Sequence, residues 1–213
     1  MTFLRPRVAI AAIVLATALP AAALAQRDDS YTWKLGLNAG IMAYQTRFQN
    51  TKVVPSVGGQ VLIMAHRGGL LLSVDEGIGT NEHATQQVLF NDIRRYQAAA
   101  MAFPIAGPVE PYFGAGLGIM QVVGPRLDPS LSQGPVQDAA TLSAAEDASA
   151  SAFLSFVAGV QGRWKRFTVF GQYEANTAPS DDKLLKGAGQ SLLGGLRIGL
   201  GSAREGINGL GGN

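Results

Sequence analysis

The sequence predicts an all-β chain that folds as an eight-stranded antiparallel up-and-down transmembrane β-barrel. The strongest pattern runs from Ser151 to Asn176, where apolar and polar residues alternate and the chain reverses once near Lys165, which predicts a β-hairpin. Each arm has about ten residues, the length that a tilted strand needs to cross the hydrocarbon of a bilayer. Glycine is the second observation: it supplies 27 of 213 residues, well above its usual share of about 7%. The third is that short and long connections between the predicted strands alternate along the chain.

Similar alternation along the rest of the chain predicts the remaining strands. In the fourth strand the apolar residues do not keep one parity, and we expect Tyr96, Ala98, Ala100 and Ala102 to face outward there. Short connections are expected near Gly68, Gly107 and Lys165, and long ones near Asn50, Asn81, Pro129 and Asp181. An up-and-down sheet then places all long loops at one end, as in outer-membrane barrels. The eight predicted strands are 31–44, 56–66, 70–75, 88–105, 109–120, 151–164, 167–176 and 191–200.

Alternation does not by itself say which face points inward, because a soluble lipocalin-like barrel that binds an apolar ligand has the same period. The apolar faces here carry large side chains on nearly every strand, more than a narrow cylinder holds. The polar faces are rich in glycine, which suits the cramped interior of eight strands. Aromatic residues such as Trp33 and Trp164 lie toward strand ends, where an interfacial girdle is expected. The apolar faces are therefore predicted to point outward into lipid, and the last strand to pair with the first.

The two ends of the chain are predicted to be separate from the barrel. Residues 1–25 have two arginines, a short apolar run and small residues before a cut after Ala25, the pattern of a secretory signal peptide. The barrel is predicted to span residues 26–201, and residues 202–213 form a glycine-rich, flexible tail. The chain has no cysteine, so no disulfide or thiolate chemistry is expected, and a net charge of +2 gives no support for nucleic-acid binding.

The eight alternating segments, together with the run PYFGAGLGIM at 111–120 after a short Gly-Pro turn, resemble the small outer-membrane β-barrel proteins of the OmpA-like and opacity-protein type. The resemblance covers residues 31–201. It implies a monomeric protein of the cell outer membrane. It also implies that the partners are outer-membrane lipid, lipopolysaccharide and the barrel-assembly machinery.

Few residues of the sequence suggest catalysis or the binding of a cofactor or metal. The glycines of GAGLG at 114–118 fall at period two within one strand, so they are interpreted as small residues facing the interior and not as a dinucleotide motif. His66 is expected in a short turn and His83 in a long loop, at opposite ends of the barrel. A lipid-modifying barrel enzyme, the alternative, would need a histidine beside a serine and a carboxylate. No enzyme activity, cofactor or metal is expected.

The charged residues on the predicted interior face form the candidate site. They are read either as a conduction path or as ion pairs that fill the interior, and the narrowness of eight strands favours the second. Glu110 is expected to pair with Arg163, and Asp75 with Arg95, because buried charges need partners. The full set of predicted interior residues is Lys34, Asp75, Arg95, Glu110, Arg163, Arg166, Glu174 and Arg197.

The largest loop, 123–150, is the best candidate for a surface contact, since loops on a rigid scaffold face the outside and carry function. A short helix is expected within its stretch DAATLSAAEDAS. The loops are expected either to contact a surface partner or lipopolysaccharide, the latter with help from Arg47, Lys52 and Arg94, or to be solvated without a ligand.

Overall fold

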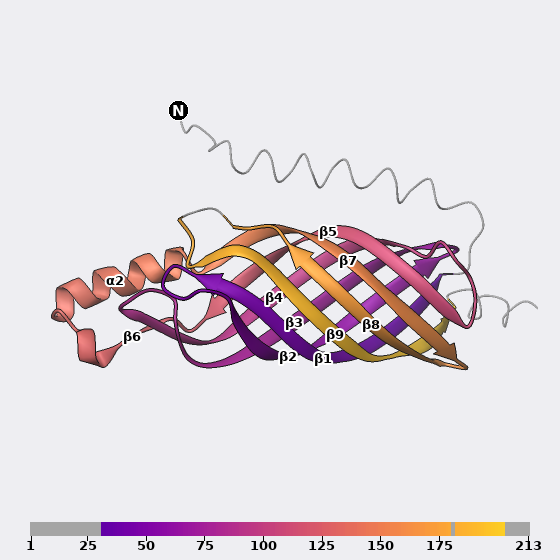
Figure 1. The fold of residues 1–213 in the computed structure, drawn as a ribbon, viewed down its shortest axis with the longest axis horizontal. Helices are drawn as coiled ribbons and strands as arrows, with labels where there is room; N and C mark the ends of the chain where they lie inside the picture. Colours follow the sequence, from indigo (N-terminus) through magenta and orange to yellow (C-terminus); the bar gives the residue numbers. More distant parts are fainter. Residues whose placement is uncertain (1–30, 180–181, 203–213) are drawn as a thin grey trace, which may run out of the picture.

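A computed structural model describes residues 31–179 and 182–202, and it shows an elongated barrel of tilted strands (Figure 1). The predicted signal peptide and residues 203–213 of the predicted tail lie outside the described residues. Within the described ranges, no helix is both long and apolar enough to cross a membrane. The elements in order are β1 (Thr32–Thr46), β2 (Lys52–Ala65), β3 (Gly68–His83), β4 (Val88–Ala102), β5 (Val109–Val123), β6 (Arg126–Leu127), η1 (Pro129–Leu131), α2 (Pro135–Asp147), β7 (Ala150–Trp164), β8 (Phe167–Asn176) and β9 (Leu185–Ser202).

Eight of the strands close into a barrel in which every neighbouring pair is antiparallel. The order is β3-β2-β1-β9-β8-β7-β5-β4, and β4 pairs back onto β3. The short strand β6 is not one of the eight. It pairs only with the first two residues of β4, where Arg126 lies opposite Leu89. The predicted closure between the last and first strands is confirmed, with Leu37 of β1 opposite Leu196 of β9. Closure leaves no exposed edge among the eight strands, as a spanning sheet requires.

Several strands are longer than their sequence pattern predicts. The third does not fade at Gly77 but continues to His83 across an irregularity between Ile78 and Glu82. His83 is therefore in a strand and not in a loop. The second strand begins at Lys52 and the last at Leu185, so each of these strands takes in part of the polar stretch before it. β9 also includes Ser202, which the predicted tail contained.

The ends of the barrel are arranged as predicted. Connections 66–67, 103–108 and 165–166 lie at one end, the turn end, and connections 47–51, 84–87, 124–149 and 177–184 lie at the other, the loop end. The predicted alternation of length holds only in part, because 103–108 is longer than 84–87. The predicted helix in the largest loop is confirmed as α2, which projects beyond the loop end (Figure 1).

The apolar faces of the strands point outward, as predicted. Leu154, Val169 and Leu196 are 57%, 63% and 42% exposed, and the same parity is kept on the neighbouring strands. The uncertain fourth strand also follows its prediction, because Tyr96 is 41% exposed while Arg95 is buried. A lipocalin-like barrel would turn these apolar faces inward, so this alternative is wrong.

The interior of the barrel contains large apolar side chains as well as small and polar ones. The alternation of the strands did not predict these apolar side chains. Two clusters of buried apolar side chains lie inside, one toward each end of the barrel. Toward the turn end, Leu62, Leu71 and Met101 pack with Phe103 and Tyr112. Toward the loop end the cluster combines strand residues with residues of the connections and of α2. Its members are Met42, Tyr44, Val54, Ala84, Val88, Phe90, Ile93, Met120, Val122, Ala145, Phe153, Leu184 and Leu185.

Candidate functional site in the barrel interior

Arg95 is the centre of the first group of charged residues inside the barrel. Its side chain is fully buried and donates from Nη2 to Oδ2 of Asp75 at 2.9 Å, which confirms the predicted pair. The same nitrogen lies 2.5 Å from Oε2 of Glu174, and Nη1 donates to the hydroxyl of Ser191 at 3.0 Å. Asn38 donates to the other oxygen of Asp75 at 2.9 Å. One buried cation is thus held between two buried carboxylates.

Arg197 is the centre of a second group, formed mainly by amide side chains. Its guanidinium donates to the side-chain oxygens of Gln161, Gln60 and Gln172 at 3.0 to 3.2 Å. The guanidinium carbon also lies 3.8 Å from the ring centroid of Phe170, a cation-π geometry. The amide nitrogen of Gln172 in turn donates to Oε1 of Glu174 at 2.7 Å. Since Glu174 also pairs with Arg95, the two groups form one network.

A third group continues the network toward the turn end. The amide nitrogen of Gln161 donates to Oε2 of Glu110 at 2.7 Å. Arg163 donates to Oε1 of Glu110 at 3.0 Å, which confirms the second predicted pair, although its side chain is half exposed. Lys34, buried as predicted, donates to the hydroxyl of Thr168 at 3.4 Å.

Arg166 does not join the network, and its prediction is wrong. It lies with Lys165 in the two-residue turn between β7 and β8, where its side chain is exposed. Lys165 has a positive φ of 54°, so the chain leaves the strand geometry on which the parity argument depends. The other predicted interior residues are buried inside the barrel, except Arg163, which is half exposed at the turn end.

Glycines on the inner face leave the space that the large interior side chains occupy. A Cβ on Gly36 would lie 2.8 Å from Cγ of Arg197, and one on Gly159 would lie 2.6 Å from the Tyr112 ring. Such distances are shorter than real Cβ contacts, so a side chain at either position would displace the network. The glycines of GAGLG also face inward, and the dinucleotide reading has no structural support.

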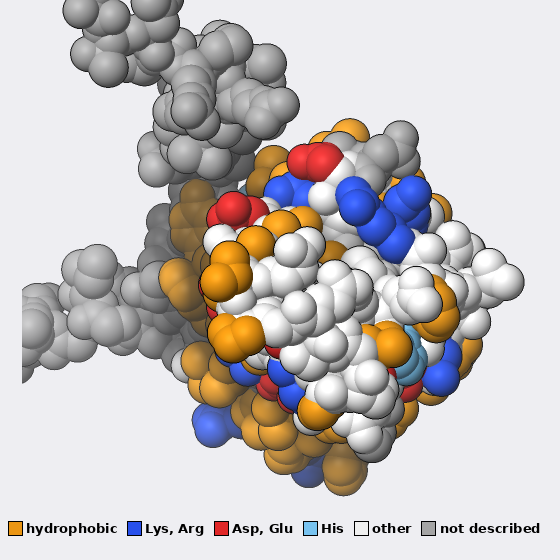
Figure 2. All heavy atoms as spheres, turned by 90° about the vertical axis from the view of Figure 1, so that its left-hand side faces the viewer, with side chains coloured by type: hydrophobic (Ala, Val, Ile, Leu, Met, Phe, Trp, Pro, Cys, Tyr) orange, Lys and Arg blue, Asp and Glu red, His pale blue; other side chains and the backbone are white. Residues whose placement is uncertain are grey.

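The connections at the loop end are joined to one another over the barrel. The amide of Leu184 donates to the carbonyl of Ala148 at the end of α2, at 3.1 Å. Arg47 donates from Nε to the carbonyl of Lys183 at 3.0 Å. Ala145 of α2 is buried against the apolar cluster below. Figure 2 views this end, with mostly uncharged polar side chains and backbone over the middle.

The histidines do not form a catalytic group in the part of the chain that the structure describes. His66 lies in the turn between β2 and β3, and His83 lies at the other end of the barrel, with its ring 5.3 Å from that of Phe48. Among the residues that the structure describes, no hydrogen bond joins either histidine side chain to a serine or a carboxylate. Among the same residues, no group of three or more possible ligands could hold a metal ion.

Comparisons with known proteins support the fold. No protein-family model matches the chain, and no similar curated protein sequence was found. Among solved structures, Neisserial surface protein A is similar at 15% identity and a TM-score of 0.56, over 78% of this chain and 96% of that one. The N-terminal barrel domain of Pseudomonas aeruginosa OprF (14%, TM-score 0.49, 78% and 96%) and Ail of Yersinia pestis (17%, TM-score 0.47, 79% and 98%) also match. At this identity, the likeness to Neisserial surface protein A shows the fold alone, which is that of the small eight-stranded outer-membrane β-barrels.

Proposed function

We propose that this chain is a non-catalytic β-barrel of the outer membrane, with a structural or surface-interaction role. The observation that carries the proposal is the distribution of side chains around the closed barrel. Large apolar residues are exposed on the outside, while buried charges pair with one another inside. A protein dissolved in water would have the reverse arrangement, because exposed apolar patches of this extent drive association.

Export by the predicted signal peptide and insertion by the barrel-assembly machinery follow from this proposal. The test is membrane partition of the full chain expressed in a Gram-negative host. The protein is expected in the outer-membrane fraction, resistant to alkaline washing and released by detergent. Recovery from the periplasm without detergent would contradict the proposal.

The interior is proposed to be closed to solutes. The network crosses the barrel from Arg95 to Glu174, and apolar clusters lie on both sides of it. Eight strands leave an interior just wide enough for side chains. In planar bilayers the purified protein is expected to give no steady ionic current, and stable open channels would contradict a closed interior.

The loop end is proposed to face the cell exterior and to carry any surface contact. Loop 124–149 is the longest connection, and α2 extends it away from the barrel. Val136 on α2 is 87% exposed, so a partner has access to this helix. Loss of cell-surface binding to lipopolysaccharide or to a neighbouring protein on deletion of 129–147, with the barrel still folded, would identify the loop as the contact.

A further inference from the structure

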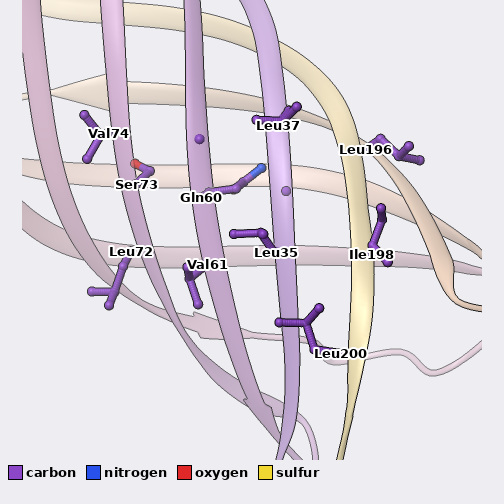
Figure 3. Close-up of a pocket in the computed structure, with 12 residues that line it drawn as sticks. Leu35, Leu37, Gln60, Val61, Leu72, Ser73, Val74, Leu196, Ile198 and Leu200 are labelled. Atoms are coloured by element: carbon purple, nitrogen blue, oxygen red, sulfur yellow. The ribbon is translucent and has the colours of Figure 1, made fainter.

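The outer wall of the barrel has an apolar hollow of about 610 Å³ across β9, β1, β2 and β3. Figure 3 shows leucine, valine and isoleucine side chains around it, from all four strands. Gly59 lies on its floor, opposite Leu37 of β1 and Val74 of β3. Because Gly59 has no side chain, the apolar wall is interrupted at this point.

A second hollow, of about 400 Å³, continues the first toward the loop end. The two share Leu37 and Val74 in their lining, so they form one groove along the outside of β2. The second hollow reaches Glu76, whose Oε1 accepts a hydrogen bond from Nη2 of Arg94 at 2.8 Å. The groove is therefore apolar toward the turn end and has an ion pair at its loop-side end.

We infer that this groove binds one anionic membrane lipid, with an acyl chain over Gly59 and the phosphate at Arg94. The occupant follows from the two ends of the groove. The hydrocarbon-facing part offers only apolar contacts, and beside the other end lies the Arg94 guanidinium, which has five N–H donors and hydrogen-bonds with Glu76 and Tyr96, so further donors remain for a phosphate. The part along β2 from Val61 to Val57 is about 13 Å long, enough for a substantial part of an acyl chain. The inference rests on the proposed membrane location.

Gly59 allows a direct test because a side chain fits there without strain. A Cβ at this position would meet only the carbonyl oxygen of Gly36, at 3.8 Å. Gly59→Leu therefore fills the groove while leaving the barrel intact. Gly171 supplies a matched control, since it also faces outward, on β8, and a Cβ there meets nothing within 4 Å.

The experiment counts lipids on the folded barrel by native mass spectrometry. Wild type, Gly59→Leu and Gly171→Leu are folded into phosphatidylcholine nanodiscs containing phosphatidylglycerol, and far-UV circular dichroism verifies that each variant is folded. Wild type and Gly171→Leu are expected to retain one phosphatidylglycerol. Gly59→Leu is expected to retain it about fivefold less, equivalent to about 1 kcal/mol.

Arg94→Gln tests the charged end separately. It is expected to abolish the preference for phosphatidylglycerol over phosphatidylcholine, while Gly59→Leu lowers retention of both lipids. Equal retention by Gly59→Leu and Gly171→Leu would overturn the inference, as would a wild-type dimer that Gly59→Leu dissociates, because a second copy would then occupy the groove. Failure of wild type to insert into any bilayer would instead contradict the proposed membrane location.

Discussion

Arg95 and Glu174 meet inside the barrel at 2.5 Å, although they belong to β4 and β8, which do not pair with each other. Both side chains are fully buried, and Asp75 supplies a second carboxylate to the same guanidinium. A buried charge that loses its partner retains its desolvation cost without the compensating attraction. The stability of the barrel interior therefore depends strongly on this one arginine.

Arg95→Met is expected to destabilise the folded barrel by about 3–5 kcal/mol, because it leaves Asp75 and Glu174 buried without a cation. Urea unfolding in lipid vesicles, followed by tryptophan fluorescence, measures the change. Arg166→Met is the control, since Arg166 is exposed in a turn, and a change within about 0.5 kcal/mol is expected for it. Equal effects of the two substitutions would contradict the assigned network.

The stacking of Arg197 on Phe170 is expected to contribute a coupling free energy of about 1–2 kcal/mol, as for a desolvated cation-π pair. A double-mutant cycle with Arg197→Met, Phe170→Leu and the double variant measures it by urea unfolding. Arg197→Lys is also expected to destabilise, because an ammonium does not reproduce the forked hydrogen bonds to Gln161 and Gln60. If the effects of the two single substitutions are additive, the Phe170 ring does not stabilise Arg197.

Gly159→Leu is expected to prevent folding, whereas Gly171→Leu on the next strand is expected to fold. A Cβ on Gly159 meets the Tyr112 ring inside the barrel, while Gly171 faces open space outside. The fraction refolded in detergent micelles, from far-UV circular dichroism, distinguishes the two. Efficient folding of Gly159→Leu would mean that the interior has room that the structure does not show.

The proposed orientation predicts which end is accessible on intact cells. The natural chain has no cysteine, so Val136→Cys on α2 and Lys165→Cys at the turn end each supply one thiol. A membrane-impermeant maleimide is expected to label the first on intact cells and the second only after the outer membrane is opened. The reverse pattern would invert the orientation.

The start of α2 is expected to loosen in acid. Asp138 accepts from the Ser132 hydroxyl at 2.5 Å and from the Gln133 amide at 2.9 Å, and these hydrogen bonds lower the pKa of its carboxyl. A lowered folded pKa means that the stabilisation is complete above the ordinary value of about 3.9 and is lost as the pH falls through the folded value. Hydrogen exchange of amides 132–138 should therefore accelerate below about pH 4, and Asp138→Asn should remove this dependence.

The sequence predicted much of the fold because the side chains of a strand alternate with a period of two residues. Once Val169 and Tyr173 are placed on the outer face of β8, the position of Glu174 on its inner face follows. Pairs on neighbouring strands were also predictable: Asp75 and Arg95 lie directly opposite each other on β3 and β4.

The contacts that cross the barrel were not predictable from the same pattern. The meeting of Arg95 and Glu174 depends on strand tilt and register around the whole barrel, which alternation does not contain. The apolar clusters were not predictable either: alternation gives residues such as Met42 and Leu71 interior parity but does not show that interior side chains from different strands pack together. Strand lengths were underestimated because alternation disappears at the loop end, where polar residues such as Glu82 continue the pairing of β3.

The pairing of β1 with β9 bears on how the protein is assembled. Before these two strands join, the sheet is an open ribbon, and the carboxylate on β8 cannot be held against the guanidinium on β4. Such a ribbon, laid flat in hydrocarbon, would leave Glu174 without its arginine and would expose a row of unbonded amides along each of its two edges. The pairing of β1 with β9 and insertion into the membrane should therefore occur together. Barrels in which this pairing is incomplete would be too high in free energy to accumulate in lipid.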